Sequence, residues 1–335
     1  MGLVVTAQVL SSSAVVMPHG EWRARALRHR ERVVELLGCE PAEAAQRRKD
    51  PRLNFIFQYY YGFKPRDLVA WSPGLGVDLA TGGPEDSQWL YRKFWRTEDG
   101  THKLSLQAKA SQVAALRRTS EILETKAHPV WNCYGLHEWA MLYGGADRKQ
   151  DLPLRISRSL LDEVVATPGA LRCTHFDAFR FFAEDAKPMN QLQTLGRATH
   201  AAEQPACVHY NMDLFKFALR VTPFIPSELL ADALDVALTA RTLDLRASPY
   251  DLSSLRDSTN FDLDPVPVET SQGRKLYTDL QADILRKATP VRRQLAQAYA
   301  DLSQRLDHEE GPREKETRLL GHDDKKAQIS HEMSL

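Results

Sequence analysis

The sequence has few of the features that would assign it to a well-defined class. Its apolar runs fall short of the ~20 residues that a transmembrane helix requires, and its N-terminus lacks the basic segment that begins a secretory signal. Four cysteines in 335 residues, none in CxxC spacing, argue against a disulfide framework, a zinc ribbon or a redox motif. We therefore expect an intracellular, cytoplasmic protein with reduced thiols and no transmembrane segment.

The sequence also lacks an excess of charge of either sign. Lys plus Arg and Asp plus Glu both number 44, so the formal charge is zero and the pI is near 7.2. Proteins that bind duplex DNA usually concentrate positive charge to meet the phosphates, so we favour a small-molecule substrate over nucleic acid. The Gly74-x-Gly76 pair lacks the third glycine of a dinucleotide-binding loop, and no nucleotide cofactor is indicated.

The clearest pattern in the sequence is the helical periodicity of its apolar residues. Hydrophobic residues make up 43% of the chain, which is enough for a substantial core. Apolar residues recur at helical spacing over residues 22–37, 104–126, 226–242 and 272–306, the last with a kink or interruption at Pro290. The sequence therefore predicts a mainly α fold with few or no strands.

The predicted helices form one compact domain with loosely held ends. We expect a flexible leader over residues 1–18 and a single helical catalytic domain over 19–306. Residues 307–335 are highly charged and poor in large apolar side chains, which predicts a disordered tail.

Three segments in the middle of the chain repeat one unusual grouping: a thiol, an imidazole and a nearby carboxylate. They read Cys133-Tyr-Gly-Leu-His137-Glu138, Cys173-Thr-His175-Phe-Asp177 and Cys207-Val-His209-Tyr-Asn-Met-Asp213. Residues four apart share a helix face, so Cys133 could point with His137, and His209 with Asp213. Three histidines that each have an acid nearby favour one shared functional site.

We expect His137, His175 and His209 to converge on a metal, with Asp213 as a carboxylate ligand. Fe(II) and Zn(II) fit such a set equally well. Three acids are candidates for the catalytic carboxylate, namely Asp177, Asp213 and Glu138. If a metal is bound, Glu138 or Asp177 would orient the imidazole rings.

Structural readings of the same residues stay open. Thr174 and Asp177 have the spacing of a capping box, in which both side chains serve backbone amides at a helix start. A free cysteine is usually a small buried hydrophobe, so each thiol has a structural alternative. The candidate residues for substrate binding are Tyr59, Tyr60, Tyr61, Trp139, Asn211, Arg246 and Tyr250, and the aromatic ones could equally be core.

Four of these segments together resemble a bacterial family. They are Cys133-Tyr-Gly-Leu-His-Glu-Trp-Ala-Met-Leu-Tyr143, His175-Phe-Asp-Ala-Phe-Arg-Phe-Phe182, Asn211-Met-Asp-Leu-Phe-Lys216 and Arg246-Ala-Ser-Pro-Tyr-Asp251. The family is commonly labelled 3-methyladenine DNA glycosylase, and the resemblance covers roughly residues 22–300. It implies hydrolysis of the N-glycosidic bond of an alkylated base. A flipped base would lie against Tyr59 to Tyr61 or Trp139, and Asp213 or Asp177 would polarise the water.

Three functional hypotheses follow. The leading one is a metal-dependent enzyme that acts on a small molecule, by oxidative chemistry with iron or by hydrolysis with zinc. The second is the DNA glycosylase that the resemblance implies. The third is a non-catalytic helical binding protein in which the paired thiols and imidazoles belong to the core.

Overall fold

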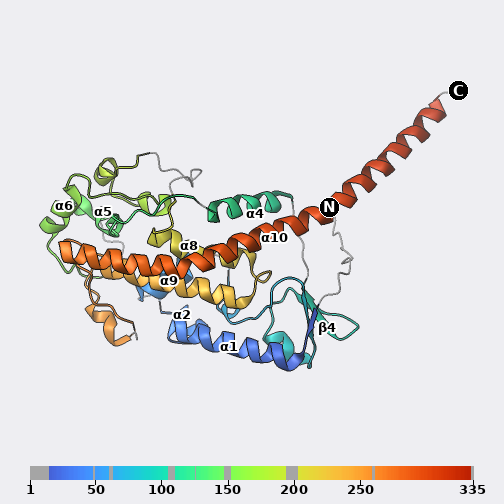
Figure 1. The fold of residues 1–335 in the computed structure, drawn as a ribbon, viewed down its shortest axis with the longest axis horizontal. Coiled ribbons are helices and arrows are strands. Elements are labelled where there is room, and N and C mark those ends of the chain that lie inside the picture. The colour runs from blue at the N-terminus through green and yellow to red at the C-terminus, as the bar shows by residue number, and fades with distance from the viewer. Residues whose placement is uncertain are drawn as a thin grey trace.

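Three long helices form the centre of the protein. The structure is a computed structural model, and it describes residues 15–47, 50–59, 63–104, 110–124, 126–146, 152–193, 203–258 and 261–332. These helices are α8 (Val208–Val221), α9 (Ser227–Ala247) and α10 (Ser271–Glu332). Helix α8 packs against α9, and α10 lies along both (Figure 1). The mainly helical, single-domain fold expected from the sequence is confirmed.

The central helix α9 is buried on nearly all sides because its neighbours surround it. Helix α1 (His19–Leu37) packs against it from a third direction and ends at Gly38, which adopts the left-handed conformation typical of a residue just past a helix end. Most of its residues are buried, among them Leu234, Val236 and Leu238, and its partly exposed positions form one polar stripe that includes Asp232 and Asp235. Because a helix with so wide an apolar surface is stable only inside a protein, α9 forms the middle of the core.

Helix α10 is unbroken through Pro290, so of the two alternatives predicted there the interruption is wrong, and the kink stays a prediction. A stripe of buried residues at helical spacing, including Ile284, Val291 and Leu295, faces α8, α9 and α4 (Ala110–Leu123). Past residue 306 the structure describes only the helical backbone, up to Glu332, and Figure 1 shows it projecting from the body. The expected disorder of the charged tail stays a prediction.

Shorter helices and turns cover the side of the core where the three Cys–His segments lie. Two of them begin at or next to a candidate histidine: α5 (His137–Ala140) and α7 (Phe176–Phe179). The other α-helices are α2 (Pro41–Ala44), α3 (Pro51–Asn54) and α6 (Arg158–Ala166). Short 3-10 turns span Pro65–Leu68, Pro84–Gln88, Tyr143–Gly145, Glu184–Met189 and Ser253–Ser258, and a π-helical turn spans Phe55–Tyr59.

A small sheet flanks the first helix. Its strands are β1 (Val15–Met17), β2 (Val77–Ala80), β3 (Phe94–Arg96) and β4 (Thr101–Leu104), in the order β1-β2-β4-β3. Strand β1 runs parallel to β2, with Val16 opposite Asp78, and the other two pairs are antiparallel. A second cluster of buried residues, centred on Trp22, Trp71 and Leu79, joins this sheet to α1.

At this sheet the structure differs from two predicted boundaries, the end of the leader and the start of the helix at Leu104. Residues 15–17 were expected to belong to a flexible leader, but they pair with β2. Leu104 ends a strand rather than beginning a helix, and α4 starts at Ala110. Within the described parts of the chain, every helix is too short or too polar to cross a lipid bilayer.

Candidate metal centre

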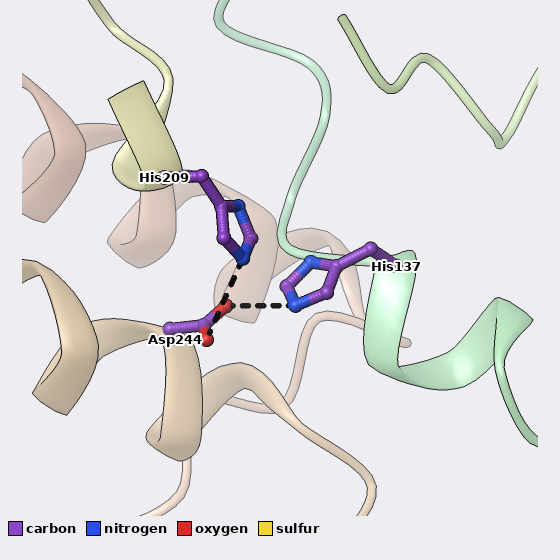
Figure 2. A group of neighbouring side chains, drawn as sticks. All are labelled: His137, His209 and Asp244. Atoms are coloured by element: carbon purple, nitrogen blue, oxygen red, sulfur yellow. Dashed lines mark ion pairs between the residues drawn. The ribbon is translucent and has the colours of Figure 1, made fainter. Parts of the chain in front are cut away.

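The core helices bring two imidazoles to one carboxylate. Asp244 of α9 lies with its Oδ1 3.2 Å from Nε2 of His137 and its Oδ2 4.0 Å from Nε2 of His209. One donor atom from each of these residues falls within 4.8 Å of the other two. Figure 2 shows the three side chains pointing toward one another from α5, α8 and α9.

A tight turn before α5 sets the position of His137. Tyr134 has φ 51° and Gly135 has φ 67°, both in the left-handed region that non-glycine residues rarely enter. A side chain at Gly135 would contact the Cβ atom of Ala247 and the ring of Tyr277, each at 3.4 Å. The chain therefore turns sharply against α9 and α10, and His137 begins its helix over Asp244.

Polar side chains fix the segment that leads into α8 and thereby position His209. Gln204 accepts hydrogen bonds from the backbone N–H groups of Val130 (2.9 Å) and Ala206 (2.8 Å). Asn211 donates to the carbonyl of Pro205 at 3.1 Å and accepts from Arg292 of α10. These buried contacts hold the first turn of α8, so His209 has a defined direction toward α9.

His175 joins the cluster from the start of α7. Asn190 pairs with the backbone of Cys173, accepting from its N–H at 2.8 Å and donating to its carbonyl at 3.1 Å, which holds this segment extended. Nδ1 of His175 lies 2.9 Å from the Glu203 carboxylate, which orients the ring, and its Nε2 lies 4.0 Å from Asp213.

The three predicted histidines meet, as the sequence led us to expect. The ring centroids of His137 and His209 are 4.2 Å apart, nearly perpendicular, and those of His175 and His209 are 5.4 Å apart and stacked. The carboxylate within 4.8 Å of both His137 and His209 is Asp244, whereas the predicted ligand Asp213 lies beside His175.

A buried arginine balances the acids beneath the histidines. Arg241, one turn before Asp244 on α9, lies 2.5 Å from the Asp244 carboxylate and 3.4 Å from that of Glu138. Burial lowers the pKa of Arg241, but the two carboxylates outweigh this effect and the pKa is raised. Burial raises the pKa of Glu138, against the opposing effect of Arg241. Two carboxyl groups, those of Asp244 and Glu138, therefore share one positive charge, that of Arg241, at the base of the site.

The surroundings of the three imidazoles shift their pKa values in different directions. Burial, the charge of Arg241 and the neighbouring His175 lower the pKa of His137 to about 3. Burial and His137 likewise lower the pKa of His209 well below its usual value. His175 differs because the hydrogen bond and charge of Glu203, with Asp213, outweigh burial and raise its pKa. His137 and His209 are thus neutral near pH 7, the form in which imidazole binds metals.

The histidines lie in a cavity of about 270 Å³ that opens to solvent. Side-chain exposure rises from His137 (3%) at its base, through His209 (15%) and Asp213 (16%), to Asp177 (45%) at its mouth, and Asp244 (0%) lies next to His137 and His209 but outside the lining. The remaining lining residues are Phe55, Glu138, Met141, His175, Ala178, Arg180, Phe181, Lys216 and Arg241. The cavity has room for a small organic molecule next to the imidazoles.

The three candidate catalytic acids all line this cavity. Asp177 forms ion pairs with Arg180 (3.1 Å) and Lys216 (3.7 Å), and Lys216 also lies 3.4 Å from Asp213. The predicted capping box of Thr174 and Asp177 is wrong, because the N-cap residue of α7 is His175, and it makes no side-chain cap. The carboxylate that orients the His175 ring is Glu203, and the orienting role expected of Glu138 or Asp177 when a metal is bound stays a prediction.

Most of the candidate substrate-binding residues lie outside the cavity lining. Trp139 is fully buried and donates from Nε1 to the Ala247 carbonyl at 2.9 Å, and Asn211 braces the start of α8. Arg246 binds Asp262 and the Asp264 carbonyl, and Tyr250 is buried in the core. Tyr60 and Tyr61 lie outside the described residues, as does the side chain of Tyr59.

The three cysteines of the repeated segments are not placed as metal ligands. Cys133 precedes α5 in a turn, so it does not share a helix face with His137 as its spacing suggested. Burial raises the pKa of Cys133 to about 11 and raises those of Cys173 and Cys207 as well. Cys173 and Cys207 are buried and Cys133 is partly exposed, and none of the three belongs to the group of possible ligands around Asp244.

Three residues of the site were not predicted: Asp244, Arg241 and Glu203. A signal for the first two exists, because Arg241 and Asp244 lie one turn apart on the apolar side of their helix, away from the polar stripe that runs from Asp232 to Arg246, and buried charges usually pair. Glu203 carries no such signal, since it lies in a polar segment far in sequence from its partner His175. Comparison with family models, with curated proteins and with solved structures finds no match for this chain.

Proposed function

We propose that the protein is a metal-dependent enzyme that acts on a small molecule in the histidine cavity. The observation that carries the proposal is the group of His137, His209 and the Asp244 carboxylate, whose donor atoms lie within 4.8 Å of one another and whose two imidazoles line the cavity. Two imidazoles and one carboxylate are the ligand set of non-haem Fe(II) enzymes and of many catalytic zinc sites.

Arg241 binds one oxygen of Asp244, but the other donor atoms of this group have no hydrogen-bond partner among the described residues. Neither His137 nor His209 forms a hydrogen bond with any described residue, and Oδ1 of Asp244 is buried without a hydrogen-bond partner although it lies 3.2 Å from His137. Buried polar groups in proteins are almost always satisfied. A cation between the three side chains would satisfy all of them together.

The surrounding residues suit catalysis at such a centre. Arg241 holds the Asp244 carboxylate in place, in the way that groups behind a ligand usually orient it. A bound Fe(II) or Zn(II) would supply a Lewis acid and, for zinc, an activated water. His175, held by Glu203, and Asp213 are the groups of this chain placed to move a proton beside the substrate.

Metal analysis tests the proposal directly. Protein purified without a His-tag should retain close to one equivalent of iron or zinc, or take it up on anaerobic incubation with Fe(II) or with Zn(II). The His137→Gln and His209→Gln variants should lose this binding, and the matched variant of an exposed histidine, His128→Gln, should keep it. Folding of each variant is checked by circular dichroism. A folded wild-type protein that binds neither metal would overturn the proposal and favour a non-catalytic binding protein.

The DNA glycosylase hypothesis remains as a second proposal because of two acids and two cations at the cavity mouth. Asp177 and Asp213 could polarise a water, and Arg180 and Lys216 could meet the phosphates beside a flipped base. Release of 3-methyladenine from alkylated duplex DNA, lost in Asp213→Asn and retained in His137→Gln, would place this function above the metal-dependent one. Absence of release by folded protein would remove it.

A further inference from the structure

A second cavity, of about 320 Å³, lies at the opposite end of α8 from His209. It lies between the turn at Pro65–Leu68, residues 91–93 and the last turn of α8, and it shares no lining residue with the histidine cavity. His209 is the second residue of α8 and Leu219 lies ten residues further along, a helical rise of roughly 15 Å. The two cavities are therefore separate sites on one helix.

The second cavity concentrates positive charge in a protein whose total charge is zero. Lys64, Arg66, Arg92 and Lys93 line it, together with a single acid, Asp67. Within the described part of the chain none of these four cations forms an ion pair, whereas many other cations of the protein do. The Asp67 carboxylate already accepts a hydrogen bond from the backbone N–H of Lys64 at 2.9 Å.

The cavity is held in shape before any ligand binds. The Tyr91 hydroxyl donates to the backbone carbonyl of Asp67 at 2.6 Å, which joins two of the lining segments. The Lys93 ammonium lies 4.8 Å from the centre of the Phe224 ring, and burial lowers the pKa of Lys93. Like charges brought together without partners repel one another, so an anion between them would be stabilised by all four.

We propose that this cavity binds a small organic phosphate that carries at least two negative charges. Arginine forks bind phosphate oxygens through paired hydrogen bonds, and lysines add point charges. The apolar part of the lining, Phe63, Leu219 and Pro223, would contact the organic portion of the ligand. The inference is independent of the metal centre, because it uses none of the same residues.

Calorimetric titration with pyrophosphate and with ADP tests the proposal. The titrations use the full chain with His137→Gln, so that phosphate binding at a metal does not contribute. ADP should bind more tightly than pyrophosphate, because the organic portion adds contacts. The double variant Arg66→Gln/Arg92→Gln should weaken binding by about tenfold or more.

A matched double variant controls for the loss of charge. Arg28→Gln/Arg293→Gln removes two exposed cations that form no ion pair with the described residues, and it should change binding less than about twofold. Equal losses in the two double variants, or no binding of either probe to the parent, would overturn the site. A DNA duplex that binds more tightly than ADP, and whose binding is lost in Arg66→Gln/Arg92→Gln, would overturn the small ligand in favour of nucleic acid.

Discussion

Two regions of this protein place a pair of imidazoles around one buried aspartate, and they treat that aspartate differently. Beside the sheet, the Asp86 carboxylate is hydrogen-bonded to Nε2 of His19 at 3.0 Å and to Nε2 of His102 at 3.2 Å. It also accepts hydrogen bonds from the backbone N–H groups of Gly82 (2.7 Å) and Gly83 (3.3 Å). In the helical core, Asp244 has His137 and His209 near it without a hydrogen bond to either.

Under the proposed function, the difference separates a structural cluster from a metal-binding one. Asp86 is satisfied by donors from α1, β4 and its own loop, so it joins the sheet to the first helix and has no capacity left for a ligand. Asp244 is fixed by Arg241, but the imidazoles around it keep their nitrogens free. Residue types alone do not distinguish the two clusters, whereas their hydrogen bonds do.

Metal affinity should show the largest contrast. Replacing His209 with Gln should weaken metal binding by about 100-fold or more, since changes behind a ligand already cost 10–100-fold. The corresponding change in the sheet, His19→Gln, should leave metal affinity unchanged. Equilibrium dialysis with Zn(II) measures both. Similar losses in the two variants would mean that the comparison between the clusters is mistaken.

Stability should show the reverse order. Asp86→Asn replaces an acceptor with an amide that faces several donors, so unfolding free energy should fall by about 2–4 kcal/mol. His209→Gln removes a partly buried imidazole without a hydrogen bond and should change stability by less than about 1 kcal/mol. Urea denaturation of the metal-free proteins measures both values. A larger loss for His209→Gln than for Asp86→Asn would contradict the structural role of the sheet cluster.

A smaller effect is expected at the turn before α5. Gly135→Ala places a side chain at φ 67°, against Ala247 and Tyr277, and should destabilise the protein by about 1–2 kcal/mol. It should also weaken metal binding, because the turn positions His137. The control is Gly20→Ala in α1, which has open space around it and should be neutral or stabilising by roughly 0.5–1 kcal/mol. Wild-type stability and metal affinity in Gly135→Ala would show that the turn does not position the site.

The pH dependence of stability should show the smallest difference. Burial raises the pKa of Asp86, but the hydrogen bonds from Gly82, His19, His102 and Gly83 outweigh this effect and lower it from 3.8 to about 2. Because the folded pKa lies below the unfolded one, the stabilisation is complete above about pH 4 and is lost as the pH falls toward 2. It should amount to roughly 1–2 kcal/mol, since nearby solvent screens part of it.

Denaturation of wild type and Asp86→Asn across this range isolates the acid contribution. The stability difference between the two proteins should narrow as the pH falls from 5 to 2. A difference that stays constant would assign the effect to the amide's geometry rather than to the carboxylate charge.

The sequence allowed the histidines to be predicted but not their carboxylate. His137, His175 and His209 stood out because each follows a cysteine and precedes an acid, and their rings do meet. Asp244 lies 35 residues after His209, and only the packing of α8 against α9 brings them together. Local spacing therefore favoured Asp213, which shares the helix of His209 but faces His175.

The fold shows the same contrast. Elements fixed by local sequence were predicted, and elements that depend on contacts distant in sequence were not. Helix α1, with its apolar stripe and Gly38, was predicted within three residues at its start and correctly at its end. Strands of three or four residues carry too little periodicity to be recognised, and β1 depends on β2, which lies sixty residues away. The unbroken path of α10 through Pro290 likewise depends on its packing against α9 and α8.

Crystals soaked in Zn(II) and measured at the zinc absorption edge test the central claim most directly. The account predicts one strong anomalous peak about 2.0–2.2 Å from His137 Nε2, His209 Nε2 and an oxygen of Asp244, and no peak at Asp86. No peak at Asp244, or peaks of equal strength at Asp244 and Asp86, would contradict it.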